Sequence, residues 1–330
     1  MSDIKILFNS YPTAFQKMGG GEKQIEQYYN FLKKKNFYVK KYNQWSKYQK
    51  INNFDIIHFF SVIPGGSLDF LRYAKNQNKK IVISPNIWLD DKKHDEFNQI
   101  KYILHLVDII IVNSEIEKRK ISNLFDIDYS KIKVIFNFVD NNYFDTKKFE
   151  ENFVYKFNVK KPYLLTVGNI EKRKNQNAII EILHKFPNLN FVNIGNIRDE
   201  NYLKSYKGKT NKIYLIKYQK NKNILKSAYE GSDIFILPSL CETPSIAALE
   251  AACMNKKIII TSVGSTTEYF KNYVSYIDTN NSYNLEKVIK NLLIQKKPKF
   301  LKKYIINNFI ESIQMPKLIK IYKDLHGNSN

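Results

Sequence analysis

Residues 238–251 bring together two carboxylates and the start of a helix, groups that bind hydroxyls and anions. The segment reads PSLCETPSIAALEA and holds Glu242 and Glu250, eight positions apart. Its pattern predicts a strand over 233–238 and a helix over 245–253. Glu242 therefore lies in the connecting loop, and Glu250 lies about two turns further along the chain.

The start of this helix is a predicted anion site. Pro244 suits the first helical turn, and the N–H groups from Thr243 to Ile246 point out of the N-terminus. A diphosphate bound there would leave room for a polyol beside each glutamate, since carboxylate oxygens accept hydrogen bonds from hydroxyls. On its own, the segment fits a capped amphipathic helix with two solvated glutamates better than it fits such a site.

The elements that must hold this segment alternate along almost the whole chain. Near-continuous Ile, Val and Leu runs predict strands buried on both faces, hence parallel sheets covered by helices. Predicted strands are 4–8, 54–60, 80–84, 107–113, 133–136, 163–167, 190–194, 212–216, 233–238 and 257–262. Predicted helices include 22–35, 176–185, 222–229, 245–253 and, after Pro316, 317–325.

A polar segment at 140–160 reads as a linker and divides the pattern into two α/β halves of similar size. We expect a first domain over 1–150 and a second over 151–305, each doubly wound. Ligands of such sheets bind at the carboxyl ends of the strands, so the two domains predict a cleft between two sheet edges.

A series of short motifs resembles a known enzyme family over nearly the whole chain. They are GGGE at 19–22, DIIH at 55–58, DIIIVNS at 108–114, KIKVIFNFVD at 131–140, VG with RKN within 167–175, DIFILPS at 233–239 and GSTTEYF at 264–270. With the spacing of Glu242 and Glu250, the chain resembles the retaining glycosyltransferases of the GT-B fold, family 4 (group 1). The resemblance implies two Rossmann-like domains facing each other across a cleft, with the C-terminal helix, 306–330, packed on the first.

The resemblance also implies roles for individual residues. Glu242 would bind hydroxyls of the transferred sugar, and Glu250 the ribose hydroxyls of the nucleotide. Lys174, with Arg173, would hold the diphosphate and neutralise the leaving group. The other implied donor-binding residues are Gly168, Asn169, Thr243, Ser245, Ile246 and Tyr218, with Gly20 and Gly21 from the first domain.

Retention in this family is explained by front-face attack, in which the departing phosphate takes the acceptor proton and no protein nucleophile is needed. Two positions depart from the family pattern: Asn169 stands where an arginine is usual, and Asn86 where a histidine often follows a strand. Asn86, His58 and Ser114 are assigned to the cleft or the acceptor. His58 fits a hydrogen-bonded structural histidine equally well.

Neither a metal nor another cofactor is expected. The five histidines are scattered, and Cys241 and Cys253 read as two free thiols in a reducing compartment. Asp126 and Asp128 form a D-x-D pattern in an expected surface loop. No run approaches the roughly 18 apolar residues of a membrane span, and the first residues lack a leader pattern, so the expected location is the cytoplasm.

The formal charge of +22 favours anionic partners, although a lysine-rich coding bias also accounts for part of it. Residues 33–50 mix seven lysines with five aromatic residues, and a second basic cluster spans 296–303. Such mixtures suit peripheral binding at the inner face of an anionic membrane, and residues 33–50 fit a solvated helix end followed by a strand at least as well. No nucleic-acid-binding motif is present, and no nucleic-acid partner is expected.

The expected function is transfer of a sugar from a nucleotide-diphosphate-sugar to a glycan or lipid-linked acceptor, in surface polysaccharide or glycolipid synthesis. The alternatives are another enzyme on this scaffold, such as an epimerase or a glycogen-type synthase, a catalytically degenerate partner subunit, and a basic nucleic-acid-binding protein.

Overall fold

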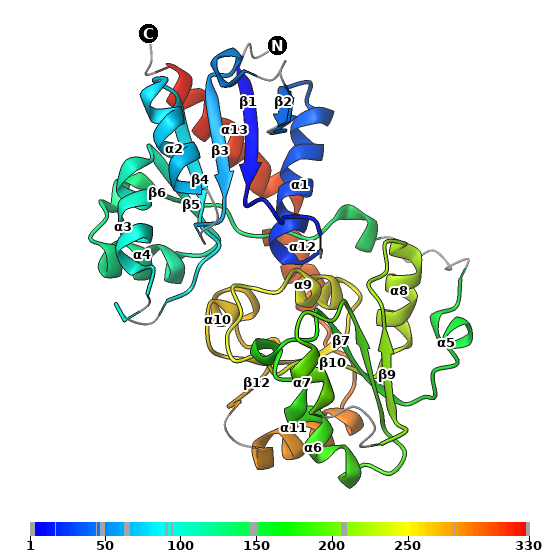
Figure 1. Cartoon of the computed structure of the whole chain (residues 1–330). Coiled ribbons are helices and arrows are strands. Elements are labelled where there is room, and N and C mark those ends of the chain that lie inside the picture. Colours follow the sequence, from blue (N-terminus) through cyan, green and yellow to red (C-terminus); the bar gives the residue numbers. More distant parts are fainter. Residues whose placement is uncertain are drawn as a thin grey trace. The chain divides into compact units, whose positions relative to one another are not determined.

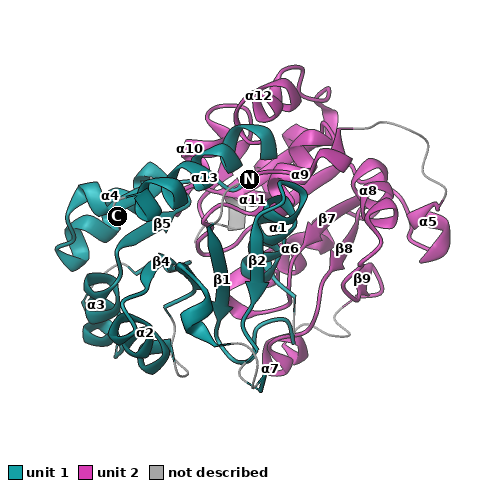
Figure 2. Cartoon of the chain, turned by 90° about the horizontal axis from the view of Figure 1, so that it is seen from above, with its two compact units in different colours: residues 1–137, 311–330 teal, residues 138–310 magenta. Residues whose placement is uncertain are grey.

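The computed structural model describes residues 4–16, 18–43, 45–46, 50–62, 67–89, 92–93, 95–144, 151–205, 210–279 and 282–327. The chain divides into two compact units, one of residues 1–137 and 311–330 and the other of residues 138–310 (Figures 1 and 2). Each unit contains a six-stranded sheet in which every strand pair is parallel. The predicted fold class, two doubly wound Rossmann-like α/β domains, is confirmed.

The first unit (teal in Figure 2) has the strand order β2-β1-β3-β4-β5-β6. The strands are β1 (Lys5–Ser10), β2 (Tyr38–Lys41), β3 (Ile56–Phe60), β4 (Lys80–Ser84), β5 (Ile109–Val112) and β6 (Ile132–Val134). The helices are α1 (Gly20–Lys34), α2 (Ser67–Asn76), α3 (Phe97–Leu106), α4 (Glu115–Phe125) and α13 (Glu311–Gly327), with short 3-10 turns at Ile51–Asn53 and Tyr129–Lys131.

The two faces of this sheet are covered by different helices. The core of one face joins the apolar residues of α2, α3 and α4 to inward-pointing residues of β1, β3, β4 and β5. On the other face α1 and α13 pack together, and Tyr28 and Tyr322 contact the ring of His58. The first unit is therefore completed only by α13, drawn in red behind its strands in Figure 1.

The second unit (magenta in Figure 2) has the order β12-β11-β10-β7-β8-β9. The strands are β7 (Tyr163–Val167), β8 (Asn190–Ile194), β9 (Ile213–Ile216), β10 (Ile234–Leu237), β11 (Lys257–Thr261) and β12 (Ser275–Ile277). The helices are α5 (Phe153–Lys156), α6 (Asn177–Ile182), α7 (Glu200–Lys204), α8 (Lys222–Gly231), α9 (Ile246–Cys253), α10 (Thr266–Phe270), α11 (Ser282–Ile294) and α12 (Leu301–Asn308), with 3-10 turns at Asn141–Tyr143 (η3), Lys172–Lys174 (η4) and Leu183–Lys185.

Helices α6, α7 and α11 share one apolar core with β7, β8, β10, β11 and β12. α12 packs on α9, and α5 packs on α8. In both sheets the chain first builds strands to one side and then to the other, so the strand order reverses between β1 and β3 and between β7 and β10. Such reversal points are where doubly wound sheets bind ligands.

The unit boundaries differ from those expected. The first boundary lies at 137/138 and not at 150/151, and residues 306–310 stay with the second unit, so the return to the first unit begins at Glu311. The expected linker contains η3 and α5, whose start is capped by the Asn152 side chain. Residues 145–150 lie outside the described part of the chain.

Three element predictions need correction. The edge strands β2 and β12 were missed because neither has the apolar run of a strand buried on both faces; β2 buries only Val39. The last helix begins at Glu311 and contains Pro316, which the sequence predicts at its start. Proline removes one helical hydrogen bond. The burial of Met315, Leu318 and Tyr322 in the first unit stabilises the helix on both sides of this proline.

Candidate active site

Two loops meet at the strand-order reversal of the second unit. One follows β7 and runs through η4, and the other follows β10 and leads into α9. They are joined through the backbone, since the Leu240 N–H donates to the Arg173 carbonyl at 2.9 Å. Residues far apart in sequence, around 174 and 242, are thereby brought together, as the resemblance implies.

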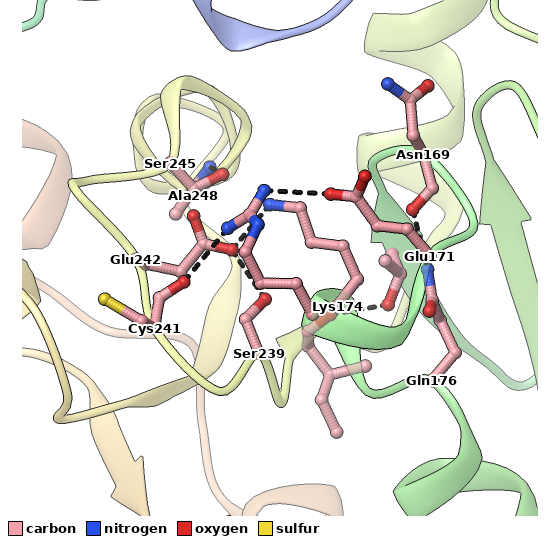
Figure 3. A network of polar contacts seen from close by, with 12 residues as sticks. Asn169, Glu171, Lys174, Gln176, Ser239, Cys241, Glu242, Ser245 and Ala248 are labelled. Atoms are coloured by element: carbon pink, nitrogen blue, oxygen red, sulfur yellow. Dashed lines mark hydrogen bonds and ion pairs between the residues drawn. The ribbon is translucent and has the colours of Figure 1, made fainter. Parts of the chain in front are cut away.

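Lys174 and Glu242 form an ion pair at the centre of this site (Figure 3). The Lys174 Nζ lies 2.5 Å from the Glu242 Oε1, with side-chain exposures of 12% and 5%. The Ser239 hydroxyl donates to the same oxygen at 2.5 Å. Burial raises the pKa of the Glu242 carboxyl, but the charges of Lys174 and Arg173 and these two hydrogen bonds outweigh it. The pKa therefore lies below its ordinary value, and Glu242 is a carboxylate at neutral pH.

Arg173 is oriented by its own loop. Its guanidinium donates to the Cys241 carbonyl at 3.1 Å and to the Glu171 carboxylate at 2.9 Å (Figure 3). Its side chain is 53% exposed. Arg173 thus contributes positive charge beside Glu242 from the solvent side, whereas Lys174 lies inside the site.

Gly264 fixes the backbone of Glu242. The Ser265 N–H donates to the Glu242 carbonyl at 2.9 Å, and the Glu242 N–H donates to the Val263 carbonyl at 3.1 Å. Gly264 has a φ of +103°, and a Cβ on it would lie 2.0 Å from the Glu242 carbonyl oxygen. Only glycine combines that backbone conformation with so close an approach. This explains why the motif at 264–270 begins with glycine.

Glu250 lies on α9 and is 1% exposed. The Tyr229 hydroxyl donates to its Oε2 at 2.8 Å. Burial raises the pKa of Tyr143 and of Tyr229 well above the ordinary value, and hydrogen bonding to Glu250 raises both further. Two buried tyrosines from η3 and α8 therefore hold this carboxylate. Neither was predicted as a site residue, because 23 tyrosines give no signal that singles out two of them.

The start of α9 corrects one detail. Pro244 lies before the helix and not in its first turn; Ser245 is the capping residue, and its hydroxyl accepts from the Ala248 N–H at 3.4 Å. Ile246 is the first helical residue, so its N–H is among those that lack an acceptor within the helix. Thr243 is half-buried in the loop before the cap. The helix N-terminus thus lies next to Glu242 in sequence and presents N–H groups, as expected.

The loop after β7 uses Asn169 structurally. Asn169 is 7% exposed, its Oδ1 accepts from the Asn196 N–H at 3.1 Å, and its carbonyl accepts from Gln176 at 2.9 Å (Figure 3 labels Asn169 and Gln176). The Lys174 side chain runs 3.6 Å from where a Gly168 Cβ would lie. A side chain at position 168 would therefore touch Lys174 at an ordinary contact distance, and Asn169 holds the loop where the family pattern has a charge. Tyr218, 36% exposed, follows β9 and adds to the raised pKa of Tyr143.

In the first unit, four side-chain amides meet at the carboxyl ends of the strands. Asn86 donates to Gln24 at 3.1 Å, Gln24 donates to Asn113 at 2.7 Å and to Asn137 at 3.1 Å, and Asn113 donates to Asn86 at 3.3 Å. Asn86 has a φ of +50°. The sequence pointed to Asn86 alone: Asn113 and Asn137 lie inside quoted motifs without an assigned role, and nothing marked Gln24.

Gly20 and Gly21 are the first two residues of α1, after Gly19 in extended backbone. A Cβ on Gly20 would meet no atom within 4 Å, and one on Gly21 would lie 3.9 Å from the Asn86 amide. Space is therefore open beside Gly20 within the first unit, and the part of both glycines in binding the donor stays a prediction.

Two of the predicted cleft residues are structural. His58 is fully buried; its Nδ1 lies 2.6 Å from the Tyr322 hydroxyl and its Nε2 lies 2.9 Å from the Ser84 hydroxyl. Burial lowers the pKa of His58 to about 3. Ser114 is also buried, and it caps α4 by accepting from the Glu117 N–H at 3.0 Å. Both side chains thus form hydrogen bonds that hold the first sheet and its helices together.

Among the described residues, no three His, Cys, Asp or Glu side chains are grouped so as to hold a metal ion. The D-x-D residues serve turns: Asp126 ends α4 in left-handed backbone, and the Asp128 carboxylate accepts from the Ser130 N–H. No helix in the part of the chain that the structure describes is long and apolar enough to cross a membrane. Of the basic cluster at 33–50, Lys47 and Tyr48 lie outside the described residues.

Two family models match the chain, and together they span nearly all of it. The model "Glycosyltransferase Family 4" matches residues 3–143, and "Glycosyl transferases group 1" matches residues 147–309.

Two curated proteins are related in sequence. An uncharacterized glycosyltransferase of Methanocaldococcus jannaschii is 26% identical over 181 residues, which cover 51% of this chain and 46% of that protein. A processive diacylglycerol alpha-glucosyltransferase of Acholeplasma laidlawii is 21% identical over 206 residues, which cover 60% and 61%. The chain thus spans about half to three fifths of these relatives.

Solved structures share the fold over nearly their whole length. A glycosyltransferase from Rickettsia africae superposes with a TM-score of 0.72 at 20% identity, covering 98% of this chain and 99% of the other. HepE from Anabaena, in complex with UDP and glucose, gives 0.79 at 14%, covering 97% and 99%. Because these likenesses show the GT-B fold and the two family models match either half, the chain belongs to the group 1, family 4-like glycosyltransferases.

Proposed function

We propose that the chain is a retaining glycosyltransferase that moves a sugar from a nucleotide-diphosphate-sugar to a glycan or lipid-linked acceptor, in surface polysaccharide or glycolipid synthesis. The observation that carries the proposal is the buried Lys174–Glu242 pair at the strand-order reversal of the second sheet. A protein of the same fold was solved with UDP and glucose, which supports a nucleotide-sugar as the donor.

In the proposed reaction the bond between the sugar C1 and the diphosphate oxygen breaks, and the acceptor oxygen bonds to the same face of C1. The acceptor proton passes to the departing phosphate oxygen, so no protein nucleophile takes part. Lys174 and the N–H groups at the start of α9 stabilise the negative charge that develops on the leaving group. Lys174, these N–H donors and the nearby Arg173 together stabilise the charge of the diphosphate. The proposal assigns no step to a metal ion.

The two carboxylates divide the donor between them. Glu242, charged and anchored by Lys174 and Ser239, accepts hydrogen bonds from hydroxyls of the transferred sugar. Glu250, held by Tyr229, accepts them from the ribose. Because a bare diphosphate offers no hydroxyls that donate to them, both carboxylates favour the intact donor over a bare diphosphate.

The test is thermal unfolding of the protein with UDP, GDP, ADP or CMP, each with and without magnesium. A nucleotide at 100 times its dissociation constant adds about 2.7 kcal/mol of stability. We expect one diphosphate to raise the melting temperature by roughly 2–4 °C without needing magnesium, and Glu250→Ala to abolish the rise. No rise with any nucleotide, in a folded protein, would refute the donor site.

Retention is tested separately on the product. With the accepted donor and a glycan acceptor, the anomeric proton coupling in the NMR spectrum reports the configuration at C1. We expect the configuration of the donor to persist. An inverted product would leave the donor site in place and overturn the front-face mechanism.

We further propose that the protein acts at the inner face of an anionic membrane. Ile294 and Phe300 are 87% and 65% exposed, and they flank the exposed Lys296, Lys297 and Lys299. Apolar and basic side chains together suit a lipid headgroup region, and one relative is a diacylglycerol glucosyltransferase. Co-sedimentation with phosphatidylcholine vesicles should require added phosphatidylglycerol and should fail for Lys296→Glu with Lys299→Glu. The control pair Lys160→Glu with Lys204→Glu should still sediment.

A second candidate is a partner subunit that binds the donor without turning it over. It is favoured by Asn169, which holds its loop where the family pattern carries an arginine. This candidate predicts nucleotide binding, with no nucleoside diphosphate released from the donor by any acceptor, and it fails if release is catalytic.

A further inference from the structure

A pocket of about 410 Å³ opens within the first unit, and none of its described lining residues is among the donor-binding or cleft residues assigned above. Its walls include residues at the carboxyl ends of β1, β2 and β3, among them Ser10, Lys41 and Phe59. β1 and β3 are the neighbours at which the strand order of this sheet reverses. The pocket therefore occupies the ligand position of a doubly wound sheet, and its volume suits a small ligand.

Aromatic rings dominate the described lining of this pocket. Tyr42 and Phe70 pack with ring centroids 4.9 Å apart. Phe15 is 37% exposed and Trp45 is 86% exposed. Side chains of Asn9, Ser10 and Asn43 add hydrogen-bonding groups. Flat apolar faces beside amides and hydroxyls match a pyranose ring, whose C–H faces stack on aromatic rings and whose hydroxyls need polar partners.

Phe15 is held in an unfavourable backbone conformation. Its φ is +71°, in the left-handed region that bulky residues rarely adopt. The turn around it is closed by the Ala14 N–H to the Tyr11 carbonyl at 3.0 Å and the Gln16 N–H to the Thr13 carbonyl at 3.2 Å. Strain of this kind gathers at ligand sites, and here it presents an aromatic ring at the pocket wall.

Lys41 is the one charged residue among the described residues that line the pocket. Its Nζ lies 4.7 Å from the centroid of the Phe15 ring and 5.0 Å from that of Tyr29. A cation set on aromatic faces at the wall gives the pocket a positive side, which favours an anionic group on the ligand.

We propose that this pocket binds a pyranose or cyclitol ring with an adjacent phosphate or carboxylate, the anion at Lys41 and the ring against Phe15 and Trp45. Its use as the site for the acceptor rests on the proposed function. The same chemistry is found in a soluble sugar phosphate and in the headgroup of a glycolipid or inositol lipid, so the test compares the two.

The test uses the fluorescence of Trp45, one of two tryptophans in the chain. Trp88→Phe leaves Trp45 as the sole tryptophan. This protein is titrated with glucose 1-phosphate, methyl α-glucopyranoside, inorganic phosphate, and phosphatidylcholine vesicles with or without phosphatidylinositol. We expect glucose 1-phosphate to bind about tenfold more tightly than the glucoside or phosphate alone, because ring and anion are recognised together.

Two variants and a matched control decide which side chains bind. Lys41→Ala should remove the advantage of the phosphate, while Lys40→Ala, on the neighbouring residue outside the pocket lining, should change affinity less than about twofold. Phe15→Gly should weaken binding of the ring without loss of stability, since glycine accepts the positive φ. Quenching by phosphatidylinositol vesicles alone, dependent on Lys41, identifies a lipid headgroup; quenching by the sugar phosphate identifies a soluble acceptor.

Equal losses for Lys41→Ala and Lys40→Ala, or no quenching by any probe, would overturn the pocket assignment. A nucleotide-dependent rise in melting temperature, measured on the same sample, separates this result from the proposed function. If the nucleotide binds and the pocket probes do not, only the pocket proposal fails; if the pocket binds and no nucleotide does, the acceptor role falls with the donor site and the sugar-anion pocket remains.

Discussion

The Tyr229 hydroxyl donates to the Glu250 Oε2 at 2.8 Å, and neither side chain is more than 1% exposed. A carboxylate buried to this degree is costly unless hydrogen-bonded. The bond therefore does two things: it offsets the burial of Glu250, and it sets the direction of the carboxylate plane before any ligand arrives. Pre-orientation of this kind lowers the entropic cost of binding.

Tyr229→Phe should weaken binding of the nucleoside diphosphate by about tenfold, because a hydrogen bond to a charged group contributes roughly 1.5–3 kcal/mol. Isothermal titration would measure it. Tyr163→Phe is the control, since its buried hydroxyl donates to the Ala228 carbonyl at 2.7 Å. Both variants should lose stability, but only Tyr229→Phe should lose nucleotide affinity; an equal loss of affinity in the two would show a general loosening of the unit.

Lys174→Ala should lower the free energy of unfolding by roughly 3–5 kcal/mol, because it leaves the buried Glu242 carboxylate without its cation. It should also raise the pKa of Glu242, since the charge and the hydrogen bond of Lys174, which lower that pKa, are removed. The exposed neighbour Lys172→Ala should change stability by less than about 0.5 kcal/mol. Denaturant unfolding checks both, and a similar small effect for Lys174→Ala would mean that the pair is open to solvent.

The pH dependence of Glu242 has a definite sign. Its pKa is lower in the folded protein than its ordinary value of 4.5. The resulting stability is therefore present above pH 4.5 and is lost as the pH falls through the folded value. In Glu242→Gln this part of the acid destabilisation should disappear. Equal acid slopes in the variant and the parent would contradict the assigned charge.

His58 predicts a second acid response, in the first unit. Its folded pKa of about 3 lies below the ordinary 6.5, so the unfolded chain binds the extra proton between these values. The stability due to the neutral ring is complete above pH 6.5 and falls by about 1.4 kcal/mol per pH unit below it. His58→Gln should be less stable at pH 8 but flatter between pH 6.5 and 5. A variant with the parent's slope would show that His58 does not titrate on unfolding.

Gly264→Ala should destabilise the protein and reduce transfer together, because the new Cβ would lie 2.0 Å from the Glu242 carbonyl oxygen at a φ that alanine avoids. The carbonyl must move, and the Glu242 side chain moves with it. Gly327→Ala, where a Cβ meets no atom within 4 Å, is the matched control. Circular dichroism and turnover would be measured on both; normal turnover for Gly264→Ala would separate the backbone of Glu242 from its side-chain role.

The buried strands were predictable, and the donor-side residues could be proposed, because both leave a local mark in the sequence. Apolar runs such as 234–237 are typical of strands covered on two faces. The spacing of Glu242 and Glu250 can be recognised directly in the sequence. Lys174 lies nearly seventy positions before Glu242 and was assigned only through the family resemblance. No local sequence pattern predicts that these two loops are in contact.

What the sequence could not give depends on packing between distant segments. The tyrosines that hold Glu250 lie on η3 and α8, and the amides that meet Asn86 lie on α1 and after β5 and β6. Edge strands such as β2 were not predicted, because much of their surface faces solvent. Their polar residues interrupt the apolar run by which buried strands are recognised. His58 lies in the middle of β3 and Ser114 follows β5, and only their hydrogen-bond partners show that they hold the fold.

The discontinuous make-up of the first unit bears on how the protein forms during synthesis. The ribosome completes residues 138–310 before it makes the helix that bonds Tyr322 to His58. Domains usually fold in the order in which they emerge, but here the unit that emerges first must wait with one sheet face covered by α1 alone. The second unit, to which we assign the nucleotide-sugar, can reach its native state earlier, so under that proposal a nascent chain should gain affinity for the donor before its first unit is complete.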